Sequence, residues 1–124
     1  MSRAKVVSLE DVDPVELPMG SWSRLLVTAD TVEGNSSTIG YSIFKAGLVA
    51  ADLSHSVEEL AFVVSGRGVI RLEDDELGVR AGQALFVPAR MWHTVVNDSD
   101  EDLAMVFSFP LPDYPPTERR DPRQ

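Results

Sequence analysis

The sequence predicts an all-β fold, a single domain built as a β-sandwich or barrel. Short runs rich in β-branched and aromatic residues recur along the chain, and turn-forming residues separate them at nearly regular intervals. The length of 124 residues is near the commonest domain size and is enough for one hydrophobic core. Strands are therefore expected to enclose that core.

The N-terminal part of the chain is expected to lead into the domain rather than to belong to its core. Residues 1–20 are mixed and polar, and Pro14 and Pro18 interrupt them. A proline has no backbone N–H and does not fit inside a central strand. This segment is therefore predicted to be an arm that carries one edge strand, over residues 4–8.

Eight strands are expected after the arm, because each run ends at a turn signal. Gly47, Gly66, Pro88 and Pro110 stand at or close after four of these ends, and polar stretches stand at others. The acidic residues 74–76 lie between two short runs and are expected to turn a hairpin. In chain order the expected strands are residues 22–29, 38–45, 60–65, 69–73, 77–79, 84–87, 92–96 and 103–109.

One of these strands has an alternative. Ser56 and Glu59 have the spacing of a capping box, and residues 60–64 have a rough helical periodicity that would end at Gly66. On that interpretation Glu59 is only a capping residue of a short helix. The run Phe62-Val63-Val64 and the neighbouring strands favour a strand instead.

The C-terminal residues 110–124 hold five of the eight prolines, together with arginines and acids. This composition cannot build core, so an extended or disordered tail with solvated arginines is predicted. The alternative is a segment that wraps over the domain or over a neighbouring subunit. The chain is thus divided into an N-terminal arm (residues 1–20), a barrel (residues 21–109) and this C-terminal tail.

Composition limits the possible functions. The formal net charge of −9 argues against binding to nucleic acid or to an anionic membrane surface, since both need basic patches. The absence of cysteine excludes disulfides, a thiolate nucleophile and cysteine-ligated metals. The N-terminus lacks the apolar run of a signal peptide and no long apolar span follows, so a cytoplasmic protein is expected.

The chain has two histidines, and both stand at fixed spacings from turn residues. Two imidazoles and one carboxylate can hold a transition metal on one side and leave coordination positions open. The first histidine lies in Gly47-x5-Leu53-x-His55-x3-Glu59-x6-Gly66, and the second in Gly82-x5-Pro88-x-Arg90-x2-His93-x3-Asn97.

His55, Glu59 and His93 can share one metal only if the chain turns between them. On a straight strand, residues four apart are about 13 Å from each other. Ligand atoms on one metal are about 3 Å apart, because each bond is roughly 2 Å long. A polar corner at residues 56–58 allows such a turn, and His93 would come from a strand packed alongside. A small antiparallel barrel supplies this geometry.

The two segments resemble the paired motifs of the cupin superfamily, Gly-x5-His-x-His-x3-Glu-x6-Gly and Gly-x5-Pro-x-Gly-x2-His-x3-Asn. The match extends over residues 47–97, and the short spacing between the motifs suits small bacterial members. The resemblance implies a single-domain jelly-roll barrel, or double-stranded β-helix, in which His55, Glu59 and His93 bind a metal. Two positions depart from the pattern, since Leu53 replaces the first histidine and Arg90 replaces the second-motif glycine.

A site with three ligands has more than one interpretation. It fits the two-histidine, one-carboxylate triad that suits non-haem Fe(II), so the leading expectation is an Fe(II) dioxygenase acting on a small organic molecule. The first alternative is a non-oxidative isomerase, cyclase or lyase that uses Mn, Ni or Zn as a Lewis acid. The second is a non-catalytic, small-ligand-binding cupin, for which Leu53 is the main argument.

The sequence constrains the substrate pocket and the partners less closely. Tyr41, Met91, Met105 and Phe107 are candidates to line a pocket, and the alternative for such residues is a place in the core. Arg90 is a candidate to attract a carboxylate substrate at the barrel mouth, with an exposed turn residue as the alternative. The expected partner is a small-molecule substrate, and the resemblance implies a homodimer.

Overall fold

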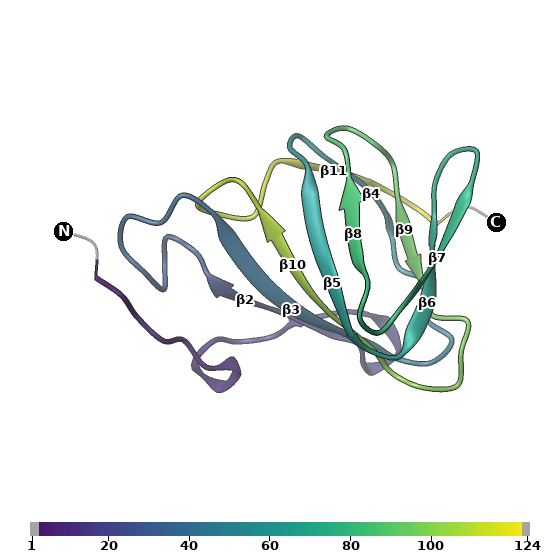
Figure 1. Ribbon diagram of the computed structural model, residues 1–124, viewed down its shortest axis with the longest axis horizontal. Coiled ribbons are helices and arrows are strands. Elements are labelled where there is room, and N and C mark those ends of the chain that lie inside the picture. Colours follow the sequence, from purple (N-terminus) through teal and green to yellow (C-terminus); the bar gives the residue numbers. More distant parts are fainter. Residues whose placement is uncertain (1–2, 123–124) are drawn as a thin grey trace.

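The computed structural model describes residues 3–122, and nearly all of its regular structure is β-strand (Figure 1). Two short 3-10 turns, η1 (Leu9–Asp11) and η2 (Pro18–Gly20), lie in the N-terminal arm. In chain order the strands are β1 (Val15–Glu16), β2 (Trp22–Val27), β3 (Thr38–Phe44), β4 (Asp52–His55), β5 (Glu59–Ser65), β6 (Arg67–Arg71), β7 (Glu76–Arg80), β8 (Ala84–Val87), β9 (Thr94–Val96), β10 (Leu103–Phe109) and β11 (Thr117–Arg120).

The strands form two walls around the core. One wall is a six-stranded antiparallel sheet in the order β1-β2-β3-β10-β5-β8. The other consists of the sheet β7-β6-β9 and the pair β11-β4. An antiparallel bridge between Leu53 and His93 joins its two parts, because it connects β4 with the residue before β9. Strands distant in sequence lie side by side in both walls, and the fold is a single-domain jelly-roll barrel (Figure 1).

The core follows from the alternation of side chains along the strands. In β5, Val63 points inward and is fully buried, whereas Phe62 points outward and is half exposed. Strand β10 lies between β3 and β5, and Leu103 and Phe109 at its two ends are both buried. Each such side chain removes apolar surface from water, which contributes about 25 cal/mol per Å² buried.

The backbone conformation explains which residues two turn positions of the motifs can accept. Gly66 has a φ of 82°, and a Cβ at this position would collide with the carbonyl oxygen of Asp102. Glycine alone suits such a turn. Arg90 has a φ of 64°, so it adopts the left-handed conformation although it has a side chain. The backbone at Arg90 thus keeps the shape that the motif obtains with glycine, and its N–H donates to the carbonyl oxygen of His55 at 2.7 Å.

The strand expected over residues 60–65 is confirmed, and the helical alternative is wrong. The other seven expected strands are also present, with ends shifted by no more than two residues. The edge strand predicted over residues 4–8 is wrong, because these residues have no regular structure and β1 is the strand of the arm. Strands β1, β4 and β11 have no counterpart among the expected strands. No helix within residues 3–122 is long and apolar enough to cross a membrane.

The C-terminal segment lies along the barrel wall. This agrees with the alternative prediction, a segment that wraps over the domain. Strand β11 pairs with β4 in antiparallel register, with Thr117 opposite His55 and Arg119 opposite Leu53. The backbone of β4 therefore has a partner strand on this side. Of the arm and the tail, residues 1–2 and 123–124 lie outside the described part of the chain.

Candidate metal centre

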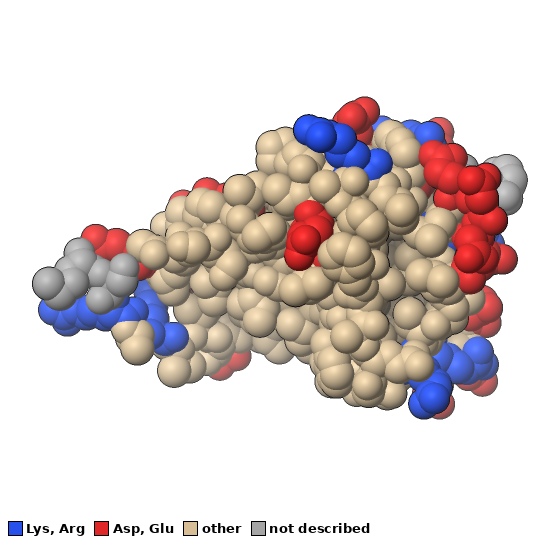
Figure 2. Space-filling model, turned by 45° about the horizontal axis from the view of Figure 1, so that its top comes forward, with Lys and Arg blue, Asp and Glu red and all other residues tan. Residues whose placement is uncertain are grey.

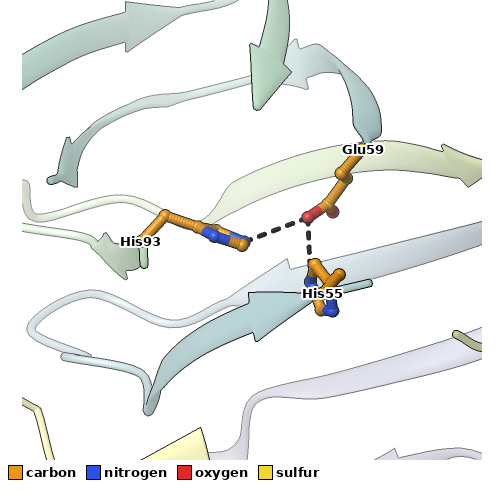
Figure 3. A group of neighbouring side chains, drawn as sticks. All are labelled: His55, Glu59 and His93. Atoms are coloured by element: carbon orange, nitrogen blue, oxygen red, sulfur yellow. Dashed lines mark hydrogen bonds and ion pairs between the residues drawn. The ribbon is translucent and has the colours of Figure 1, made fainter. Parts of the chain in front are cut away.

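Three side chains converge on one point: His55, Glu59 and His93 (Figure 3). His55 ends β4, Glu59 begins β5, and His93 directly precedes β9. The short turn between β4 and β5 brings residues four apart in sequence close together. Glu59 Oε1 lies 3.2 Å from His55 Nε2 and 3.1 Å from His93 Nε2. The structure thus brings together the three residues that the sequence singles out as metal ligands.

Hydrogen bonds on the far side of each ring decide which nitrogen faces the centre. His93 Nδ1 lies 3.0 Å from the carbonyl oxygen of Met91, which can only accept, so Nδ1 carries the hydrogen. His55 Nδ1 lies 2.7 Å from Thr117 Oγ1. The Thr117 hydroxyl donates its single hydrogen to the carbonyl oxygen of Pro115 at 2.9 Å, so it accepts from His55. Both rings therefore present Nε2, the nitrogen with the free electron pair, to the centre.

This arrangement needs a cation, because two imidazole electron pairs and a carboxylate repel one another unless a proton or a metal ion lies among them. Burial opposes a positive charge on His93, but the hydrogen bond and the charge of Glu59 outweigh burial and raise the pKa of His93 above its ordinary value. Burial also favours the neutral form of Glu59, but hydrogen bonds with His55 and His93, which form when a proton lies on Nε2, outweigh burial and lower the pKa of Glu59.

The donor set fits a divalent transition metal. Imidazole nitrogen and carboxylate oxygen are ligands that such ions accept, at bond lengths of about 2 Å. One ligand atom from each of His55, Glu59 and His93 lies within 4.8 Å of the others, so small side-chain movements close the distance to a shared ion. Neutral histidines with Nδ1 protonated are also the form in which metal ligands occur.

A cavity of about 560 Å³ adjoins these three side chains. Its volume falls in the range of roughly 300–1,000 Å³ that is typical of small-molecule pockets. Apart from the candidate ligands, its lining is largely apolar. Apolar side chains from both walls contribute to it, among them Leu25, Phe44, Leu85, Val95, Met105 and Phe107.

Of the residues predicted to line a pocket, Met105 and Phe107 line this cavity. The other three, Tyr41, Arg90 and Met91, are not among the described residues that line it. Strand alternation turns Tyr41 to the outer face of the sheet, where its ring centroid lies 6.0 Å from that of Trp22. Arg90 and Met91 are exposed in the turn before His93 and line a separate surface depression.

Strand β11 and the segment before it supply residues that sequence reasoning did not connect with the site. Thr117 binds His55, and the ring of Tyr114 packs edge-on against that of His55 with centroids 5.7 Å apart. Burial and the negative charge of Glu59 raise the pKa of Tyr114, so its phenol keeps its proton at neutral pH. Arg119 lines the cavity. Residues 117–120 are all polar, so the sequence contains no alternation of apolar and polar residues that would identify this strand.

Leu53 stands where the motif has its first histidine. It lies two residues before His55 on β4, so the two side chains project from the same face of the strand, and both line the cavity. Its side chain has no atom that binds a metal. A metal held by His55, Glu59 and His93 would therefore keep open coordination positions for a substrate.

Comparisons with known proteins agree with this fold. The family profile described as "Cupin domain" matches residues 40–109. Polyketide synthase CurC of Streptomyces cyaneus is 33% identical over 106 residues, which cover 85% of this chain and 68% of that protein. The structure of the polyketide cyclase RemF from Streptomyces resistomycificus superposes with a TM-score of 0.80 at 17% identity, covering 98% of this chain and 89% of that one.

A predicted oxalate decarboxylase from Thermotoga maritima superposes with a TM-score of 0.74 at 17% identity, covering 86% of this chain and 99% of that one. At these identities the two structural matches show a common fold. The profile spans more than half of the chain and includes both histidine segments. With the jelly-roll barrel and the CurC relative, it establishes that this chain is a member of the cupin family.

Proposed function

We propose that this cupin is a metal-dependent enzyme that cyclises a small, carbonyl-rich organic molecule without an external oxidant. The observation that carries the proposal is the convergence of His55 Nε2, Glu59 Oε1 and His93 Nε2 on the wall of a largely apolar cavity. The three residues would hold one divalent transition metal. When bound, such a metal would supply Lewis-acid chemistry toward a carbonyl oxygen of the substrate.

The other residues around the cavity would position the substrate. The apolar walls exclude water and confine a flexible substrate in a folded shape, which brings the two reacting carbons together. Leu53 adds apolar surface next to the ligands instead of a fourth donor. The Tyr114 phenol, which keeps its proton, is a hydrogen-bond donor close to the site.

The names of two similar proteins support a cyclase. CurC is a polyketide synthase protein and RemF a polyketide cyclase, and polyketides are rich in enolisable carbonyl groups. A second candidate is the Fe(II) dioxygenase expected from the sequence. It is favoured by the two-histidine, one-carboxylate set, which leaves room for substrate and dioxygen on one metal.

We also propose a homodimer that forms through the outer face of the six-stranded sheet. Leu60, Phe62 and Phe86 are 49%, 48% and 55% exposed on this face, and Phe86 stands opposite Leu60 in the register of β5 and β8. Two chains that each carry a net charge of −9 approach most easily through an uncharged surface. Acidic side chains gather instead at the end of the molecule that carries β6 and β7 (Figure 2).

Metal content is the first test of the proposed enzyme. Protein purified without a histidine tag is analysed for metals beside His93→Ala and Glu59→Gln. About one equivalent of divalent metal per chain, lost in both variants, supports the centre. A parent protein that takes up no added Fe(II), Mn(II), Ni(II) or Zn(II) contradicts a metalloenzyme.

Reaction type is tested by incubating the metal-loaded protein with linear β-polyketo acids under argon and under air, with His93→Ala as the control. An isomeric or dehydrated product that forms equally fast in both atmospheres supports the cyclase. Oxygen uptake and a product that gains oxygen atoms support the dioxygenase instead. Ligand binding without turnover that survives chelation identifies a non-catalytic binding protein.

A further inference from the structure

We propose that Arg119 binds a carboxylate group of the substrate, so that the cavity takes the anion of a largely apolar organic acid. This rests on the proposed function only in that both use the same cavity. The carboxylate would lie at the opening of the cavity, and the reacting part of the molecule would lie next to His55, Glu59 and His93.

The register of β11 on β4 places Arg119 on the cavity side. Thr117 stands opposite His55, and Arg119 stands opposite Leu53. Residues two apart on a strand share a face, so Arg119 projects on the same side as Thr117, which binds His55. The two positions are about 7 Å apart along the strand, so one ring of a substrate fits between the anion site and the candidate metal ligands.

Arg119 and its neighbour Arg120 differ in whether their guanidinium groups form ion pairs. Arg120 is held in place, because its guanidinium lies 2.6 Å from Asp52 and 3.2 Å from Glu73 and packs 4.0 Å from the centre of the Trp92 ring. Within residues 3–122, Arg119 makes no such ion pair. Its side chain is exposed and at the same time lines the cavity, so it lies at the opening.

Arg119 differs from the other residues that line the cavity in its charge. Among the described residues that line the cavity, Arg119 is the only permanent cation, and Glu59 is the only acid. Glu59 is already bound by the two imidazoles. The Arg119 guanidinium is exposed and faces an apolar cavity, in a protein whose net charge is −9, so it is suited to bind an anion. The planar fork of a guanidinium binds a carboxylate through two hydrogen bonds. The carboxylate-binding role that the sequence suggests for Arg90 thus belongs to Arg119.

The test compares naphthoate with its neutral isostere naphthamide, and measures both affinities by calorimetry. The parent protein is compared with Arg119→Gln and with Arg90→Gln, a matched loss of one positive charge outside the cavity. We expect the parent and Arg90→Gln to prefer naphthoate by about tenfold. Arg119→Gln should lose this preference while its affinity for naphthamide stays unchanged. A preference that persists in Arg119→Gln would overturn the proposal.

Each titration is repeated on metal-free and Mn(II)-loaded protein, because a metal can itself bind a carboxylate. A preference that depends on Arg119 in both forms supports the anion site. A preference that appears only with metal and is retained in Arg119→Gln assigns the carboxylate to the metal and overturns the proposal. If the protein takes up no metal but the Arg119-dependent preference remains, the proposed enzyme fails and the anion site stands.

Discussion

Replacement of Thr117 by valine tests whether the C-terminal strand shapes the metal centre. Valine has the same shape as threonine but cannot accept the hydrogen bond from His55 Nδ1, which spans 2.7 Å. The His55 ring is buried, with 3% of its side chain exposed, so water cannot easily replace the lost partner. A buried donor without a partner costs about 1–3 kcal/mol, and each 1.4 kcal/mol corresponds to about a tenfold change in an equilibrium constant.

We therefore expect Thr117→Val to weaken metal binding by about 10- to 100-fold, since the ring loses both its fixed orientation and part of its basicity. The dissociation constant is measured by competition with a coloured chelator, using Zn(II) and Mn(II). Thr117→Ser keeps the hydroxyl and should stay close to the parent. A Thr117→Val variant that binds metal as tightly as the parent would contradict this role of Thr117. A Thr117→Ser variant as weak as Thr117→Val would contradict it too.

Three further outcomes follow from the same structure. Leu53→His should restore a fourth ligand and raise metal retention against a chelator by about tenfold or more, and it should slow turnover because it fills an open coordination position. Equal retention in the variant and the parent would show that this face of β4 does not reach the metal. The pKa of His93 is raised, so protons compete with a metal for its Nε2 at higher pH than for an ordinary histidine. The apparent metal affinity should therefore fall about tenfold per pH unit below that raised pKa. An affinity that stays constant from about pH 8 to about pH 5 would speak against His93 as a ligand. Phe62→Asp places a charge on the exposed sheet face and should give monomers in light scattering, whereas a dimer that survives this change uses another surface.

Local patterns were sufficient for most strands and for the candidate ligands. The run at residues 103–109 coincides with β10, because alternating apolar residues bounded by turn residues identify a strand without any knowledge of its neighbours. His55, Glu59 and His93 could be singled out because the spacing of turn residues around them is itself local information. Strand β4 was harder to predict, since Asp52-Leu53-Ser54-His55 has little apolar character and is stabilised by its pairing with β11.

The predicted pocket residues Tyr41 and Arg90 lie outside the cavity for a different reason. Tyr41 and Phe107 both lie in predicted strands, but which face of a strand meets the cavity depends on register with the neighbouring strands. Arg90 stands next to the motif proline in sequence, yet its left-handed turn leaves it outside the cavity. A motif therefore locates a residue along the chain without determining what its side chain contacts.

The sequence by itself determined the all-β barrel, because runs of strand-forming residues are local patterns. It also determined the cupin family resemblance and the three candidate metal ligands, because both depend on spacing within short segments. Only the tertiary structure decided that β11 lies on β4, that Thr117 orients His55, and that Arg119 rather than Arg90 faces the cavity. These contacts join residues more than 60 positions apart. Such contacts form when long-range pairing brings two strands into register, and the composition of a tail rich in proline and arginine contains no sign of that register.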